Sequence, residues 1–272
     1  MSTEWAKTFR EKRLPTDLTE QLQLELRPFG VSHFYYTCFF SGEMIAGIAS
    51  RKRSNDFSFE SISSRTMERM HYIASPDPGF LRYLARYFHS YGDSDDWMKR
   101  PYQNEVVVVK QGRNRRIESA TSELKINSTA FYDTRKNVQQ VAGSYSLHSS
   151  MQTDAFENEL NSQEGRIQTI LERYHLAFME AYPLELNPWM NLGIISGAAQ
   201  KTLQLLAEGL PLEEVATSLF ISKRGVDYHL EQLKVIMEAE NRSHLIAKAC
   251  AYGLIDFTPI RFRPGPTGQD PA

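Results

Sequence analysis

The side chains best suited to chemistry in this sequence follow Ser222. Ser222 can cap a helix that begins at Lys223, and helical periodicity places Val226 and Leu230 on the inner side of that helix. Its outward positions then carry charged and aromatic side chains. Lysine and arginine reach phosphates or the O6 and N7 atoms of guanine, and a tyrosine hydroxyl suits a phosphate contact. The pattern predicts that double-stranded DNA binds to Ser222, Lys223, Arg224, Asp227, Tyr228 and Lys234.

Four short helical patterns near the C-terminal end would hold that helix in place. Ser196 can cap the first of them, and Gly209 stands where helices commonly end in a glycine. A second helix follows Pro211, and Ile221-Ser222 makes a tight corner before the third; the fourth ends at Gly253. Two short helices joined by a tight turn are typical of a helix-turn-helix, whose second helix lies in the major groove of DNA.

This region resembles the DNA-binding domain of the LuxR-type transcription factors. Two positions differ from the usual pattern of that family: Ala198-Ala199 stands in place of an Arg-Glu pair, and Gly225 in place of a threonine. The resemblance implies a cytoplasmic transcriptional regulator that binds promoter DNA as a homodimer. The matching residues are Leu203, Ala207, Gly209, Glu214, Val215, Ala216, Leu219, Ile221, Ser222, Val226, His229, Leu230, Arg242, Ala249 and Gly253-Leu254-Ile255.

The remainder of the chain mixes helical and strand patterns, which favours an α/β/α sandwich around an antiparallel sheet. The whole is then of the α+β class, with an all-α, four-helix C-terminal domain. Helices are expected over 16–26, 80–91 and 155–181, and strands over 31–40, 44–49, 105–109, 117–124 and 141–147. The expected domains are a small-molecule sensor and dimerisation domain at 1–182, a linker at 183–194, the helix-turn-helix domain at 195–256 and a flexible tail at 257–272.

The segment FGVSHFYYTCFF resembles the first pocket strand of the acyl-homoserine-lactone-binding domain, which precedes this DNA-binding domain in quorum-sensing receptors. The resemblance places Tyr35, Thr37 and Phe39 on the pocket face. A second match, VAGSYSLHSS, gives Ser146 a polar contact to a ligand carbonyl. The signal implied is an acyl-homoserine lactone or another small diffusible molecule, and no other cofactor is expected.

Two alignments compete for the residues that hold the lactone head group. The family pattern Trp-x3-Tyr-x8-Asp keeps its spacing between Phe80 and Asp93, with Leu84 in place of the tyrosine. The other alignment uses Asp77-Pro78 for the Asp-Pro step of the family and Trp97 as the later tryptophan. The candidate ligand contacts are Tyr35, Thr37, Phe39, Phe80, Tyr87, Asp93, Trp97 and Ser146.

Alternatives remain open for both the sensor fold and the function. The segment INSTAFYDTRKNVQQVAGSYSLHSS also resembles the last hairpin of a PAS domain, another sensor fold with an antiparallel sheet. The rival function is that of a protein-interaction module, which heterodimerises with another regulator and binds DNA only weakly itself. Between residues 195 and 255 six basic side chains face seven acidic ones, which favours weak binding of phosphates by this domain alone.

Composition and motifs argue against several other classes of protein. The net charge is −2, so the chain is not a globally basic nucleic-acid binder. The two cysteines, Cys38 and Cys250, exclude a disulfide scaffold and a cysteine-rich metal site. No P-loop, GxGxxG, HExxH or G-x-S-x-G motif is found, so no enzyme and no metal site are expected. No apolar run is long enough to span a membrane.

Overall fold

The computed structural model describes residues 7, 9–40, 70–91, 107–110, 124–134 and 141–255; for 89–91 and 107–110 the backbone alone is described. The chain divides into two compact units, Met1–Ile195 and Ser196–Ala272. None of the described helices combines the length and apolar character that a membrane crossing requires.

The first unit is built around a five-stranded antiparallel sheet with the strand order β2-β1-β5-β4-β3. The predicted strand VSHFYYTCFF forms β1, where it pairs along most of its length with β5, so that Tyr35 lies opposite Ser146. Aromatic and β-branched side chains favour this pleated, buried position. The strands are β1 (Val31–Phe40), β2 (Ile73–Ala74), β3 (Val107–Lys110), β4 (Ser128–Asp133) and β5 (Val141–Ser149).

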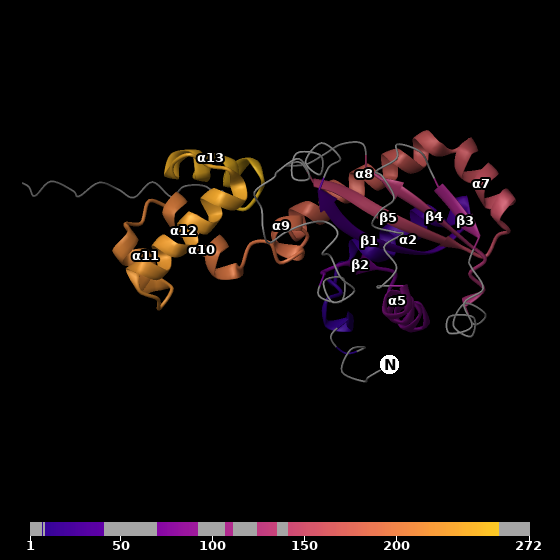
Figure 1. Cartoon of the computed structure of the whole chain (residues 1–272). Helices are drawn as coiled ribbons and strands as arrows, with labels where there is room; N and C mark the ends of the chain where they lie inside the picture. The colour runs from indigo at the N-terminus through magenta and orange to yellow at the C-terminus, as the bar shows by residue number, and fades with distance from the viewer. Residues whose placement is uncertain are drawn as a thin grey trace, which may run out of the picture. The chain divides into compact units, whose positions relative to one another are not determined.

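Helices cover both faces of this sheet. Figure 1 shows α5 on one face and α7 and α8 on the other, and α2 packs against both β1 and α8. The arrangement confirms the predicted α/β/α sandwich. The helical elements of this unit are α2 (Leu18–Leu26), the 3-10 turn η1 (Arg27–Phe29), α5 (Pro78–Tyr91), α7 (Thr153–Ser162), α8 (Glu164–Ala181) and α9 (Pro188–Asn191).

The sheet face under α8 forms the apolar core of the unit. Alternate residues of β1 and β5, among them Phe34, Tyr36 and Tyr145, are fully buried against Leu171 and Phe178 of α8. The hydroxyls of Tyr36 and Tyr145 both have hydrogen-bond partners in this core, which avoids the cost of an unpaired buried group. The Tyr145 hydroxyl donates to the Leu171 carbonyl oxygen (2.9 Å).

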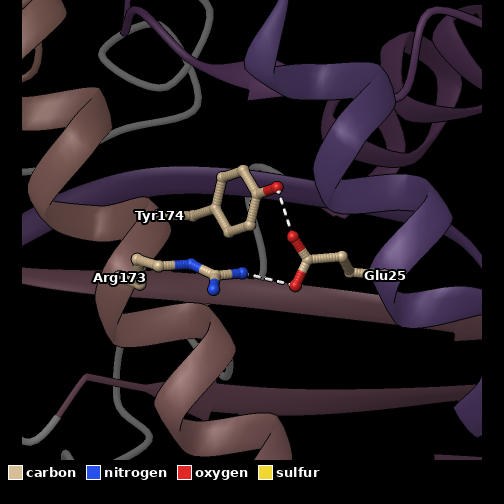
Figure 2. A network of polar contacts seen from close by, with 3 residues as sticks. All are labelled: Glu25, Arg173 and Tyr174. Carbon is tan, nitrogen blue, oxygen red and sulfur yellow. Dashed lines mark hydrogen bonds and ion pairs between the residues drawn. The ribbon is translucent and has the colours of Figure 1, made fainter.

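A polar network on the surface joins α2 to α8. Figure 2 shows the Glu25 carboxylate between the Tyr174 hydroxyl, which donates to it at 2.9 Å, and the Arg173 guanidinium, with which it forms an ion pair. Burial, and then the hydrogen bond to Glu25, raises the pKa of Tyr174 to about 12. The Glu25 carboxylate therefore has one buried partner, Tyr174, and one exposed partner, Arg173.

The outer edge of β2 is covered by the chain segment Lys12–Leu14. The Leu14 N–H donates to the Tyr72 carbonyl oxygen (2.8 Å), and the Tyr72 N–H donates to the Lys12 carbonyl oxygen (3.1 Å). Two residues further on, the Arg13 Nε donates to the Ala74 carbonyl oxygen (3.3 Å). Both backbone groups of Tyr72 and the carbonyl oxygen of Ala74 are thus paired with the N-terminal segment.

Two predicted elements differ in the structure. The helix expected over 155–181 is two helices, α7 and α8, because the chain breaks at Gln163, which has φ −122° and ψ 13°. The strand expected over 117–124 ends in a helical Leu124, and β4 follows it instead. Residues 117–123 and the strand expected over 44–49 lie outside the described residues.

The segment expected to be a linker packs onto the first unit. Trp189 of α9 is buried, and its ring meets that of Phe40 edge-on, with centroids 4.9 Å apart. The Asn191 carboxamide accepts from the His71 N–H (2.5 Å) and donates to the His71 carbonyl oxygen (3.1 Å). The segment packs there because the burial of its apolar side chains, Leu186, Trp189 and Leu192, stabilises the folded unit.

The second unit contains the four predicted helices: α10 (Gly197–Ala207), α11 (Leu212–Ser218), α12 (Lys223–Met237) and α13 (Arg242–Ala251). The Ser196 Oγ accepts from the Ala199 N–H (3.2 Å), and Gly209 has φ +86° after the end of α10, as expected for the predicted cap and glycine. Helices α10, α11 and α13 all pack against α12. The shared core includes Leu203, Val215, Val226, Leu230, Leu233 and Leu245.

Candidate functional site

The start of α12 is the best-defined candidate site in the second unit. The Ser222 Oγ accepts from the Gly225 N–H (3.1 Å), so Ser222 caps the helix as predicted. The first N–H groups of a helix have no partner within it, and the helix dipole makes this end attractive to anions. Lys223 and Arg224 are exposed on the same first turn. The turn therefore combines backbone donors with two cations, which is a chemistry suited to phosphate.

Two of the predicted cations already have carboxylate partners. The Lys223 Nζ lies 2.6 Å from the Glu213 Oε1 on α11, and the Lys234 Nζ lies 2.5 Å from the Glu231 Oε1 on α12. The hydrogen bond from Lys223 lowers the pKa of Glu213 and raises that of Lys223. A phosphate that binds at Lys223 therefore competes with the Glu213 carboxylate.

The other predicted DNA contacts lie on the exposed side of α12. Asp227 and Tyr228 are exposed, Tyr228 by 62%, one turn after Lys223 and Arg224. Lys234 lies two turns further along the helix and is partly buried. The structure thus brings five of the six predicted residues to the first two turns of α12 or its cap, with Lys234 apart from them.

In the first unit, the predicted ligand residues gather on the sheet face that α5 covers. The Tyr35 ring packs against that of Phe88 of α5 in a tilted arrangement, with ring centroids 5.1 Å apart. Phe80 lies over His33, and Tyr87 contacts Phe88 edge-on. The Thr37 hydroxyl donates to the His71 carbonyl oxygen (3.1 Å).

His148 is the polar centre of this face. Its Nδ1 lies 3.0 Å from the Thr129 Oγ1, and its Nε2 lies 3.2 Å from the Ser146 Oγ. The rings of Phe80 and Tyr83 meet the imidazole edge-on. Burial and, to a smaller extent, the neighbouring His33 lower the pKa of His148 to about 3, so the imidazole is neutral at pH 7.

Tyr72 contributes an unpaired hydroxyl to the same face. Its ring is fully buried, stacked on Phe9 (4.7 Å between centroids) and on Tyr35 (5.3 Å). Its hydroxyl is buried and has no hydrogen-bond partner among the residues that the structure describes. A buried hydroxyl without a partner costs free energy, so this oxygen and its proton are available to a bound molecule.

Sequence reasoning missed His148, Thr129 and Tyr72. His148 had a usable signal, because it lies two residues after Ser146 in a strand and therefore on the same face. Thr129 lies in the first strand of the hairpin that only the PAS resemblance implied, and Tyr72 had no signal, since no strand was predicted around β2. Asp93 and Trp97 lie outside the described residues, and Phe39 is half-buried on β1.

A cavity of about 790 Å³ lies elsewhere, between α2, the start of β1 and Pro76-Asp77. Leu24, Arg27 and His33 line it, and so does Asp77, which the second alignment uses for the Asp-Pro step. None of the eight candidate ligand contacts is among the lining residues. Among the residues that the structure describes, no three His, Cys, Asp or Glu side chains are grouped to hold a metal ion.

Similar proteins are found among solved structures and among family models. Two solved structures are similar to the chain at 14% identity: Escherichia coli SdiA (92% of this chain, 98% of that chain, TM-score 0.38) and SdiA in complex with octanoyl-rac-glycerol (93% and 97%, TM-score 0.39). No curated protein sequence matches the chain. Residues 200–249 match the family described as bacterial regulatory proteins, luxR family (GerE). The chain thus carries, from within α10 to within α13, a domain of the luxR family of bacterial regulatory proteins.

Proposed function

We propose that this protein is a transcriptional regulator that reads promoter DNA through α12 as a homodimer and senses a small molecule with its first unit. The observation that carries the proposal is the capped start of α12, where the exposed Lys223 and Arg224 follow a tight turn within the luxR-family domain. A helix presented in this way fits the major groove, with its first turn nearest the bases.

Each side chain at the start of α12 then has a distinct role. Ser222 and the first N–H groups of the helix hold a phosphate, which fixes the register of the protein on the duplex. Arg224 reads a guanine edge through its two parallel donors, and Tyr228 donates to the backbone. Lys223 exchanges its Glu213 partner for a phosphate.

Selection from a random duplex library at fixed near-physiological salt tests this proposal. The wild-type protein is expected to enrich one roughly palindromic site, and Lys223→Ala/Arg224→Ala to lose it. The double variant should also reduce the slope of log affinity against log salt by about one, because Lys223 neutralises about one phosphate whereas Arg224 contacts a base. Lys201→Ala is the matched control, an exposed cation on α10 that should leave the selected site unchanged. Enrichment of no site by the wild-type protein would overturn the proposal.

The small-molecule signal is proposed to bind on the α5 face of the sheet. Thr37, Ser146 and His148 supply hydrogen-bonding groups among aromatic rings, and the Tyr72 hydroxyl is unpaired. A molecule with a polar head and an apolar chain, such as an acyl-homoserine lactone, matches such a surface. Binding to the folded state alone stabilises it, so the ligand increases the population able to bind DNA.

Thermal unfolding with a series of acyl-homoserine lactones, from short to long chains, tests the signal. A true ligand should raise the midpoint of unfolding in the wild-type protein and raise it less in Ser146→Ala and in Tyr72→Phe. The Tyr72→Phe variant loses no internal hydrogen bond of this hydroxyl. An equal response in both variants and the wild type would remove this face from the proposal.

The homodimer is proposed to form over α2 and α8. Leu24 of α2 is 58% exposed and Leu176 of α8 is 47% exposed, and these two helices pack together. Apolar side chains exposed on neighbouring helices favour association with a second copy. Leu176→Glu is expected to shift the protein from dimer to monomer in light scattering, while Ser162→Glu at an exposed position of α7 serves as the polar control.

A second function, the protein-interaction module, is favoured by one observation. Lys223 and Lys234 are both paired with carboxylates of the same unit, which lowers the charge available to DNA. Failure of the library selection, combined with capture of a purified luxR-family regulator by this chain, would support that function instead.

A further inference from the structure

The turn between α11 and α12 holds a phenylalanine in a backbone conformation that favours glycine. Phe220 has φ +55°, in the left-handed region, where a side chain crowds the following carbonyl oxygen. The Phe220 N–H donates to the Thr217 carbonyl oxygen (3.2 Å), and the Ile221 N–H donates to the Ala216 carbonyl oxygen (3.0 Å). This bonding pattern ends α11 and usually places a glycine at the left-handed position.

Two other helices of the same unit show the usual solution. Gly209, after α10, has φ +86°, and Gly253, after α13, has φ +66°. Glu238, after α12, also has a positive φ, but its side chain is polar. Phe220 therefore combines a strained backbone with a large apolar side chain.

No contact with the described residues compensates for the strained backbone of Phe220 by burying its ring. It is 96% exposed, so no part of the molecule that the structure describes buries it. A phenylalanine left in water loses the free energy that its burial would contribute. Both the backbone conformation and the exposure of Phe220 are therefore unfavourable in the free protein, and a contact outside this chain would compensate for them.

The position of Phe220 indicates what that contact is. It precedes the cap Ser222 by two residues and so lies next to the start of α12, where Lys223 and Arg224 are exposed. In DNA, a phosphate bound at the start of α12 is attached to a deoxyribose ring. A thymine next to it presents its methyl group in the major groove. Both are apolar surfaces within one nucleotide of the phosphate.

We infer that Phe220 is a DNA contact, whose ring rests on the deoxyribose and thymine-methyl surface next to the phosphate bound at the start of α12. This inference rests on the proposed DNA-binding function. It adds an apolar contact to a site that otherwise consists of charged and polar groups. Such a contact strengthens binding without adding to its salt dependence, because no counterion is released by an apolar side chain.

The substitution Phe220→Gly tests the inference by two changes of opposite sign. The midpoint of thermal unfolding should rise, because glycine adopts the left-handed conformation freely. Affinity for the duplex that the wild-type protein selects should fall roughly fivefold to tenfold, as expected for the loss of a buried aromatic contact. The slope of log affinity against log salt should stay unchanged, whereas Lys223→Ala should reduce it.

Three further variants separate the ring from the backbone. Phe220→Asn introduces a residue that tolerates a positive φ, and its affinity for the duplex should fall by the same factor as that of Phe220→Gly. Phe220→Tyr keeps the ring and should retain the affinity of the wild type. Val235→Ala removes an exposed apolar side chain from α12 itself and should change neither the affinity for the duplex nor the slope of log affinity against log salt.

The outcomes distinguish this inference from the function on which it rests. If the wild-type protein selects a duplex and Phe220→Gly binds it as tightly, the inference is wrong and the proposed function stands. If the wild-type protein selects no duplex, the proposed function fails, and the inference fails with it. A loss of affinity in Phe220→Gly and Phe220→Asn, restored in Phe220→Tyr, supports the contact.

Discussion

The candidate functional side chains of the two units differ in how they are held. On the α5 face of the sheet, Thr37 and His148 are buried and hydrogen-bonded to neighbours that are themselves part of the fold. At the start of α12, Lys223, Arg224 and Tyr228 are exposed, and their removal leaves the core around Val226 and Leu230 intact.

This difference determines how variants of the two units can be interpreted. A substitution on the α5 face changes stability and ligand contact together, so a loss of function there has two explanations. A substitution on the outer side of α12 should change binding far more than stability, because the side chains there are exposed and an exposed ion pair such as Lys223–Glu213 contributes little to stability. The predictions that follow test this separation, beginning with the largest effect.

Acidic pH should destabilise the first unit through its buried histidines. Burial lowers the pKa of His148 to about 3 and that of His175 to about 4, below the value near 6.5 in an unfolded chain. The unfolded state then binds more protons as the pH falls below about 6.5, and stability decreases. Together the two histidines should reduce the free energy of unfolding by about 4 kcal/mol between pH 7 and pH 5.

Urea unfolding at several pH values measures this decrease. In His148→Gln the pH dependence should be about half as steep, since one of two titrating groups is gone. The same fall with pH in His148→Gln as in the wild type would show that other groups destabilise the unit.

The added methyl group in Gly143→Ala should destabilise the sheet. A Cβ at Gly143 would lie 2.6 Å from the His175 Nδ1 and 2.8 Å from the Tyr36 Cε2, and both rings are fully buried. Overpacking of this kind should cost about 2 kcal/mol of unfolding free energy. Gly165→Ala, where no atom lies within 4 Å, is the control and should be neutral or stabilising. Equal stabilities of the two variants would mean that the sheet moves to make room.

The Glu25 network allows the buried and exposed cases to be compared around one carboxylate. Tyr174 is buried and Arg173 is 61% exposed, and both contact Glu25 (Figure 2). Tyr174→Phe should cost about 1 kcal/mol, because a directed hydrogen bond is lost. Arg173→Ala should cost less than about 0.5 kcal/mol, because solvent screens an exposed ion pair. Chemical denaturation ranks the two, and the reverse order would contradict the comparison.

The smallest effect expected is on DNA affinity. Glu213→Gln removes the carboxylate that pairs with Lys223, so affinity for the selected duplex should rise about two- to threefold. The midpoint of thermal unfolding should stay the same, because Glu213 is exposed. A fluorescence titration with a labelled duplex measures the change, with Glu214→Gln as the neighbouring control. An affinity that falls would show that Glu213 itself contributes to binding.

The sequence predicted the second unit more completely than the first. Its four helices carry local signals, since Ser196, Gly209 and Ser222 each mark a helix end by their own chemistry. Strands depend on partners distant in sequence. The two-residue β2 has no pattern of its own and exists because Ile73 and Ala74 pair with β1.

The candidate sites follow the same division. The residues on the outer side of α12 follow from helical spacing, whereas the pairing of Lys223 with Glu213 joins two helices and was not predictable from that spacing. On the α5 face, Ser146 was found through a resemblance, but its neighbour Thr129 lies on β4. The break at Gln163 was missed because the apolar periodicity continues on both sides of it.

The cover over β2 has a consequence for the solubility of the protein. A strand at the edge of a sheet presents free N–H and C=O groups, which can recruit a strand from another molecule and start aggregation. Here the segment Lys12–Leu14 occupies those groups on Tyr72, and Arg13 occupies the Ala74 carbonyl oxygen. A version of the chain that starts after Leu14 would uncover this edge, and we expect it to precipitate at concentrations at which the full chain stays dispersed.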